Sequence, residues 1–120
     1  MNADAAERRD EDCVFCKIVA GEIPSERVHE DDQVIAFKDL NPQAPVHVLV
    51  VPREHRDDVR ELAHQPEQLA HVVAVAGSLA QQLADGDFRL VFNTGESAGQ
   101  TVFHVHAHVL ASGELAEGEL

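Results

Sequence analysis

The sequence predicts a single α+β domain with about five strands, hairpin connections and one long covering helix. Its length of 120 residues is that of one domain with one hydrophobic core. Short apolar runs of strand length alternate with turns that contain glycine, proline and aspartate. One long segment instead repeats its apolar residues at the spacing of a single helix face, and this segment is the predicted covering helix.

The N-terminal half contains a short helical segment followed by three strands. Gly21 and Pro24 end the helical segment. Asp31 and Asp32 separate two short runs that predict a hairpin. His47 is the single polar residue of the next apolar run, VHVLVVP. In chain order, the predicted elements are a helical or turn segment at 13–23, strands at 27–30 and 33–38, a loop at 39–45 and a strand at 46–52.

The C-terminal half begins with the long helix, which is predicted over residues 66–85. Pro66 suits its first turn and Gly86 its C-terminal end. Two strands, 88–93 and 102–110, follow and are joined by the glycine-containing loop TGESAGQ. The helix face that we expect to be buried consists of Leu69, Val72, Val73, Ala76, Leu79, Ala80 and Leu83.

The charge balance limits the kinds of partner. With 22 acidic against 9 basic residues, the net charge of -13 repels nucleic-acid backbones and disfavours polymeric nucleic acid as a partner. No apolar run approaches the roughly 18 residues of a membrane-spanning helix, and the N-terminus lacks the apolar core of a signal peptide. We therefore expect a soluble cytoplasmic protein that does not bind membranes. Its domain is expected at 13–112, between a disordered acidic tail at 1–12 and an acidic C-terminal tail at 113–120.

The segment HVHAHVL, residues 104–110, places three histidines at every second position. Because side chains alternate along a strand, His104, His106 and His108 share one face, opposite the apolar face of the same strand. Each imidazole lowers its neighbours' tendency to protonate, and a neutral imidazole is the form required of a metal ligand or a nucleophile. The pattern alone is compatible with a metal site and with a catalytic strand.

The loop before this strand, NTGESAGQT, is suited to surround a phosphate. Its glycines let the backbone approach a ligand and point amides toward it, while Asn93 and Thr101 add neutral donors. The alternative is an ordinary hairpin loop whose glycines adopt positive φ. The presence of three histidines directly after the loop favours the phosphate site.

Two cysteines, Cys13 and Cys16, form a C-x-x-C pair. In a reduced cytoplasm this spacing indicates either a redox pair or half of a metal site. The pair by itself does not distinguish the two.

Taken together, these motifs resemble the histidine triad (HIT) nucleotide-binding proteins, on their Hint-like branch. HVHAHVL matches the His-x-His-x-His signature, and NTGESAGQTVF is similar to the family's Asn-x-Gly and Gly-Gln-Ser/Thr loop. The resemblance covers about residues 13–110. It implies a HIT-like fold, with an antiparallel sheet, one long helix and one or two short helices. The dinucleoside polyphosphate hydrolases of the same superfamily usually have a glutamine where His108 stands.

The resemblance implies an enzyme that acts on the α-phosphate of purine nucleoside phosphoramidates or related nucleotidyl conjugates. The reaction would pass through a nucleotidyl-histidine intermediate and release a nucleoside monophosphate such as AMP. His106 would be the nucleophile, His108 would contact the phosphate and help to protonate a departing amine, and His47 and His104 would support them. The alternatives are a nucleotide-binding regulatory module with incidental turnover, a dinucleoside polyphosphate hydrolase, or a zinc-holding scaffold.

The same resemblance implies the nucleotide contacts. Asp39 would bind the ribose, because an acceptor-only carboxylate can take both hydroxyl protons. The loop residues implied to bind the nucleotide are Asn93, Gly99, Gln100 and Thr101. The residues implied to line the base pocket are Phe15, Ile18, Ile23, Leu40 and Asn41. For the first three of these, plain core packing is the alternative.

A structural zinc ion is also implied by the resemblance, with Cys13, Cys16, His55 and His104 as a closed tetrahedral ligand set. Free thiols and a disulfide are the alternatives, and no organic cofactor is expected. A homodimer is implied as well, in which the long helices and one strand pair about a twofold axis. The C-terminal ASGELAEGEL departs from the family, because it lacks the usual Gly-Gly-Arg and any aromatic residue. The identity of the leaving group is therefore not carried over.

Overall fold

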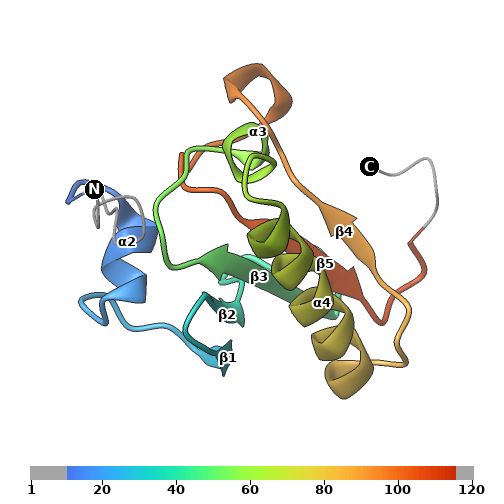
Figure 1. Cartoon of the computed structure of the whole chain (residues 1–120). Helices are drawn as coiled ribbons and strands as arrows, with labels where there is room; N and C mark the ends of the chain where they lie inside the picture. The colour runs from blue at the N-terminus through green and yellow to red at the C-terminus, as the bar shows by residue number, and fades with distance from the viewer. Residues whose placement is uncertain (1–10, 116–120) are drawn as a thin grey trace.

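The computed structural model describes residues 11–115 and confirms the α+β class (Figure 1). Five strands form one antiparallel sheet in the order β1-β2-β3-β5-β4, and the long helix α4 lies across one face of it. The strands are β1 Arg27–Glu30, β2 Val34–Lys38, β3 Val46–Pro52, β4 Arg89–Val91 and β5 Ala107–Ala111. The helices are α2 Val14–Val19, α3 Val59–Leu62 and α4 Pro66–Leu83, with a 3-10 turn, η1, at Glu96–Ala98.

Strand β3 is at the centre of the sheet and is buried on both faces. Val48 and Val50 pack in the cluster that includes the inner face of α4. Leu49 and Val51 pack on the opposite face, against Phe15 of α2. A strand covered on both sides needs apolar residues at every position, which is why VHVLVVP does not alternate. Its predicted bounds, 46–52, are confirmed.

Helix α4 ends two residues before the predicted end and is turned slightly from the predicted orientation. Val73 and Leu83 were expected inside but are 43% and 38% exposed, whereas Val75 is only 5% exposed. Val75 follows Val72 by three residues and so shares its face, while Val73 lies about 100° around the helix from Val72. The residues that α4 buries are Val72, Val75, Ala76, Leu79 and Ala80.

The histidine strand is shorter than predicted. The strand expected at 102–110 begins only at Ala107, and the one expected at 88–93 is limited to β4. From Ala107 onward β5 pairs with β3, but the Val105 amide donates instead to the carbonyl oxygen of Arg56, 2.7 Å away and outside the sheet. His104 and His106 therefore lie in an extended lead-in to β5. The predicted alternation nevertheless holds, because Val105 and Ala107 are both buried in the cluster beneath α4.

None of the helices within residues 11–115 combines the length and apolar character needed to cross a membrane. Most of the two predicted acidic tails, 1–12 and 113–120, lies outside the described residues.

Candidate active site

A cavity of about 370 Å³ opens on the sheet face opposite α4. Its floor is one row across the sheet, because Phe37 pairs with Leu49 and Leu49 pairs with His108. Side chains at paired positions of neighbouring strands point to the same face, so three strands contribute to one surface. The residues that line the cavity are Val14, Phe15, Ile18, Ile23, Pro24, Ser25, Glu26, Phe37, Lys38, Asp39, Leu40, Leu49, Thr101, Val102, His106 and His108.

Many of the residues predicted to bind a nucleotide meet in this cavity. Phe15 and Ile18 line the cavity and are also core residues, only 8% and 7% exposed. The predicted residues in the lining are Phe15, Ile18, Ile23, Asp39, Leu40 and Thr101. The predicted residues outside it are Asn41, Asn93, Gly99 and Gln100.

Residues outside the lining orient the Asp39 carboxylate and fix the conformation of the glycine loop. The Asn41 amide donates to Oδ1 of Asp39 at 2.8 Å, which orients that carboxylate. Gln100 is 3% exposed, and its Nε2 donates to the Asp57 carbonyl oxygen at 2.7 Å while its Oε1 accepts from the Gly95 amide at 2.9 Å. Gln100 thus holds the shape of the loop. Gly99, with φ of 94°, takes the left-handed conformation that ends η1.

His47 and His108 form a hydrogen-bonded pair with defined proton positions. The Gln43 amide can only donate, and it lies 2.9 Å from Nδ1 of His47, so Nδ1 is the acceptor and the proton is on Nε2. That Nε2–H donates to Nδ1 of His108 at 2.9 Å, with Oδ2 of Asp39 at 3.4 Å. His108 in its neutral form therefore carries its proton on Nε2, where it can act as a donor.

Burial keeps these imidazoles neutral. Desolvation, with the neighbouring His106 and His47, lowers the pKa of His108 to about 4. Burial also lowers the pKa of His47, and the Asp39 carboxylate opposes that shift. Burial likewise lowers the pKa of His106, against the opposing effect of its hydrogen bond to the His104 carbonyl. The site therefore holds uncharged rings near neutral pH, as a nitrogen nucleophile requires.

The tautomer of His106 is set by the chain itself. Its Nδ1 lies 2.9 Å from the carbonyl oxygen of His104, which can only accept, so Nδ1 carries the proton. Nε2 then has the free lone pair. The ring is held edge to face against Phe15, with centroids 4.9 Å apart, and it borders the cavity. Such a nitrogen can attack an electrophile bound there.

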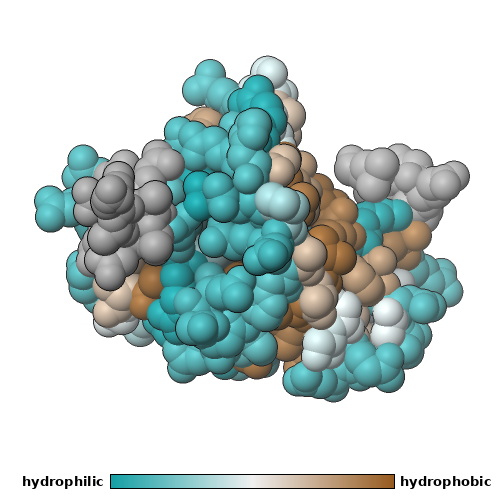
Figure 2. All heavy atoms as spheres, viewed as in Figure 1, coloured by the Kyte–Doolittle hydropathy of each residue, from teal (hydrophilic) through white to brown (hydrophobic). Residues whose placement is uncertain are grey.

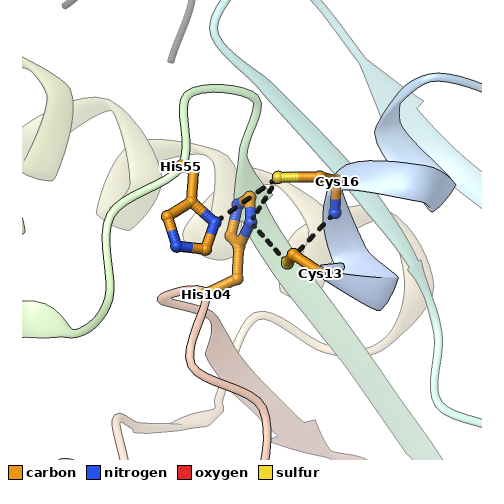
Figure 3. A group of neighbouring side chains, drawn as sticks. All are labelled: Cys13, Cys16, His55 and His104. Carbon is orange, nitrogen blue, oxygen red and sulfur yellow. Dashed lines mark hydrogen bonds between the residues drawn. The ribbon is translucent and has the colours of Figure 1, made fainter. Parts of the chain in front are cut away.

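His104 does not face this cavity and belongs instead to a second cluster, the Cys/His group of Cys13, Cys16, His55 and His104 (Figure 3). Nδ1 of His104 lies 3.4 Å from Sγ of Cys13, and Nδ1 of His55 lies 3.4 Å from Sγ of Cys16. One ligand atom from each of the four residues lies within 4.8 Å of the other three. The predicted zinc ligands are thus brought together from α2 and its N-cap residue Cys13, from the segment after β3 and from the lead-in to β5.

The donor set of the Cys/His group fits a zinc ion. Both imidazoles direct Nδ1 to the thiols and use Nε2 elsewhere: His104 donates to the Pro52 carbonyl oxygen at 2.7 Å, and His55 bonds Oδ1 of Asp57 at 3.0 Å. Metal-bound histidines use this arrangement to fix the ring and leave one nitrogen unprotonated. Burial raises the pKa of the Cys13 thiol to about 11, so its thiolate is favoured only when a cation compensates. No disulfide joins Cys13 and Cys16.

A second set of ligand atoms, from Asp39, His47 and His108, is also compact enough for an ion. A metal at this place would need an unprotonated Nε2 on His47. Because the Gln43 amide occupies Nδ1, that ring would have to lose both protons. We therefore interpret this set as a hydrogen-bond chain rather than a metal site.

Sequence reasoning missed some residues that the structure adds. Phe37 and Leu49 form the floor of the cavity, and Asp57 orients His55. The period-two pattern of each strand shows that Phe37 groups with Ile35, but it does not show which face meets α4. The only sequence signal for the role of Asp57 is its place two residues after His55, a candidate zinc ligand.

The family model described as "Scavenger mRNA decapping enzyme C-term binding" matches residues 12–119. The purine nucleoside phosphoramidase of Escherichia coli is 40% identical over 108 residues, which are 88% of this chain and 91% of that protein. The 14 kDa zinc-binding protein of Zea mays is 42% identical over 120 aligned positions, covering 93% of this chain and 92% of that protein.

Solved structures show the same relationship. A HIT family hydrolase from Clostridium thermocellum superposes with a TM-score of 0.88 at 43% identity, covering 93% of this chain and all of that one (100%). A histidine triad protein from Clostridium difficile superposes with a TM-score of 0.85 at 42% identity, covering 91% and 97%. At this similarity the likeness extends beyond the fold to the family.

Proposed function

The chain belongs to the histidine triad family, and from this premise we propose that it cleaves purine nucleoside phosphoramidates or related nucleotidyl conjugates at the α-phosphate. The product is the nucleoside monophosphate, such as AMP. The observation that carries the proposal is His106, whose Nδ1–H is held by a carbonyl while its ring borders a nucleotide-sized cavity. The 40% identity to a protein named purine nucleoside phosphoramidase supports this substrate class.

The reaction has two steps. Nε2 of His106 attacks the α-phosphorus, a bond from phosphorus to the imidazole forms, and the bond from phosphorus to the leaving nitrogen breaks as that nitrogen takes up a proton from solvent. Water then attacks the same phosphorus, the bond from phosphorus to Nε2 breaks, a proton returns to solvent, and the nucleoside monophosphate is released. His108 donates a hydrogen bond from Nε2 to the phosphoryl group and the departing amine, with Nδ1 held by His47.

The remaining contacts follow the shape of the cavity. The base lies between apolar side chains of α2 and the sheet, including Phe15, Ile18 and Leu49. The ribose hydroxyls donate to the Asp39 carboxylate, which the Asn41 amide orients. The resemblance adds three donors to the phosphoryl oxygens besides His108. Thr101 lines the cavity, whereas Asn93 and the Gly99 amide lie outside its lining and would have to reach the phosphate from the neighbouring loop.

The test is the release of AMP from adenosine 5′-phosphoramidate. His106→Ala should lower kcat on the order of 10³-fold or more, because the attacking nitrogen is lost. His64→Ala is the matched control, since His64 is an exposed histidine that belongs neither to the cavity lining nor to the Cys/His group. Rapid quenching of the wild type should trap a covalent nucleotidyl protein that His106→Ala does not form. Equal rates for the two variants would refute the assignment.

We further propose that the Cys/His group holds one structural zinc ion. The donor set, the two oriented imidazoles and the 42% identity to a protein named for zinc binding support this proposal. Zinc would stabilise the two thiolates and join α2 to the catalytic segment.

We also propose a cytoplasmic homodimer. Strand β4 is an edge strand of the sheet, with three residues, and a neighbouring copy could pair with it. Apolar side chains gather over α4 and beside β4 on the face shown in Figure 2. Val73, Leu83 and Phe88 are the exposed large apolar residues of this region, and a symmetric partner would cover them.

A further inference from the structure

We propose that residues 55–57, which we call the clamp, couple the Cys/His group to the catalytic His106, and that Asp57 is a positioning residue of the site. The catalytic part of this proposal rests on the proposed function. The structural part, a mechanical link between the two sites, stands on the contacts of the clamp.

Each residue of the clamp contacts a different part of the site. The His55 ring faces the thiol of Cys16, with Nδ1 3.4 Å from Sγ. The carbonyl oxygen of Arg56 accepts from the Val105 amide at 2.7 Å. The Asp57 carbonyl oxygen accepts from Nε2 of Gln100 at 2.7 Å. Three successive residues thus hold a metal ligand, the catalytic segment and the glycine loop.

The contact at Val105 is central because this residue stands between the metal ligand and the nucleophile. The carbonyl that fixes the tautomer of His106 belongs to His104, the residue before Val105. The Val105 side chain is 2% exposed in the cluster beneath α4, so its peptide has little room to shift. A displacement of the clamp would therefore change the position of the His104 carbonyl.

The clamp is held on its other side by helices. Nε of Arg56 donates to Oε1 of Gln68 on α4 at 3.0 Å, and Arg56 also pairs with Glu54. The Asp57 amide donates to Oε1 of Glu61 on α3 at 2.9 Å. The clamp thus transmits the position of the helical layer to the catalytic segment.

A bound metal ion would add a second link between the clamp and the catalytic segment. His55 is the first clamp residue, and its Nε2 is oriented by Oδ1 of Asp57 at 3.0 Å. His104 supplies one ligand through its side chain and holds His106 through its carbonyl. A cation bonded to both imidazoles would tie the clamp to His104 directly, in addition to the Arg56 to Val105 hydrogen bond. Metal binding should therefore reduce the motion of the segment that positions the nucleophile.

The first test measures amide hydrogen exchange in the full chain, zinc-loaded and after treatment with a chelator. The Val105 amide should exchange at least about 10-fold faster without zinc, relative to the Val50 amide in the centre of β3. Val50 reports global opening, because it is fully buried and paired on both sides. If both amides change by the same factor, zinc acts only on global stability and the coupling is wrong.

The second test uses Asp57, whose side chain is 50% exposed and whose replacement should not prevent folding. Asp57→Ala should lower zinc affinity by about 10- to 100-fold and lower kcat while KM changes little, because the nucleophile rather than the nucleotide pocket is displaced. Asp57→Asn keeps an acceptor for His55 and should recover most of both losses. Asp32→Ala, at an exposed aspartate, is the control.

The outcomes separate the two proposals. Loss of zinc in Asp57→Ala with unchanged kcat and unchanged Val105 exchange would overturn the coupling. A wild-type protein that cleaves no phosphoramidate but shows zinc-dependent Val105 exchange would refute the proposed function and support the clamp.

Discussion

At the scale of single residues, the proton positions in the site follow from neighbours that can only donate or only accept. The Gln43 amide makes His47 an Nε2–H donor, and the His104 carbonyl makes His106 an Nδ1–H donor. His108 accepts from His47 and so keeps its own proton on Nε2. Each ring is therefore a neutral imidazole with one defined task, as nucleophilic and hydrogen-bonding roles require.

The lowered pKa of His108 predicts a loss of stability in mild acid. Below the ordinary value of 6.5 the unfolded chain binds a proton at His108, but the folded chain does not until about 4. The free energy of unfolding should therefore fall as the pH drops from 6.5 toward 4. Urea unfolding of the wild type should show a decline that exceeds that of His108→Gln by on the order of 1 to 2 kcal/mol, after allowance for solvent screening. Parallel pH profiles would contradict the prediction.

The direction of the His47 hydrogen bonds predicts different effects for two amide replacements. His47→Gln places an amide donor near the position of Nε2 and should keep the bond to His108. His47→Asn places its amide near Nδ1, so it satisfies the Gln43 amide but leaves His108 without a donor. We expect kcat for AMP release to be on the order of 10-fold lower in His47→Asn than in His47→Gln. The reverse order would mean that His47 acts through Gln43 alone.

At the scale of elements, the Cys/His group joins three separate segments of the chain: α2 with its N-cap, the segment after β3 and the lead-in to β5. Helix α2 has six residues, and such a short helix is not stable by itself. Its buried residues Phe15 and Ile18 pack on the sheet, and its two thiols meet His55 and His104. A cation at this point would fix the helix that forms one wall of the cavity.

Removal of one thiol should therefore release zinc and loosen α2. Cys13→Ser should lose most of its zinc in atomic emission analysis and should melt at a lower temperature than the wild type, because the ligand set is incomplete. His64→Ala, which changes an exposed histidine, should keep one zinc per chain. A Cys13→Ser protein that retains full zinc would show that other residues bind it.

At the scale of the whole molecule, the sheet separates two layers with different tasks. The face under α4 holds a closed apolar core, while the other face holds the cavity and α2. β3 serves both faces, and β5 carries Val109 toward the core and His108 toward the cavity. At the far edge, Phe88, directly before β4, and Val73 and Leu83 on α4 leave apolar side chains exposed.

This exposed edge predicts a dimer that one charge should disrupt. Light scattering of the wild type should give twice the mass of the chain. Val73→Asp should give a monomer with an unchanged circular dichroism spectrum, because Val73 is 43% exposed and its replacement leaves the core intact. Asp85→Asn, a change of charge at the end of α4 without a new buried charge, is the control. A monomeric wild type would refute the proposal.

Local patterns made much of the fold predictable from the sequence. The helical period of the apolar residues located α4, a continuous apolar run located β3, and Pro66 and Gly21 marked element ends. The predicted strand through the triad begins too early, at residue 102. The Val105 amide does not pair within the sheet, because it donates to the carbonyl oxygen of Arg56, about fifty residues earlier in the chain. The loop motif predicts that Gln100 binds the nucleotide, and this stays a prediction. The sequence did not indicate that the Gln100 amide also bonds the Gly95 amide within the loop and the distant Asp57 carbonyl.

The sequence by itself determined the element types, the alternation of the histidine segment and the family, because these depend on spacing along the chain. The resemblance already implied that His104 joins the two thiols while His106 and His108 meet the phosphate, and the tertiary structure decided how each ring is turned and held. It also decided which carbonyls and amides set their protons. The physical reason is that hydrogen-bond partners and burial are properties of segments brought together by packing, and the spacing within one segment does not specify them.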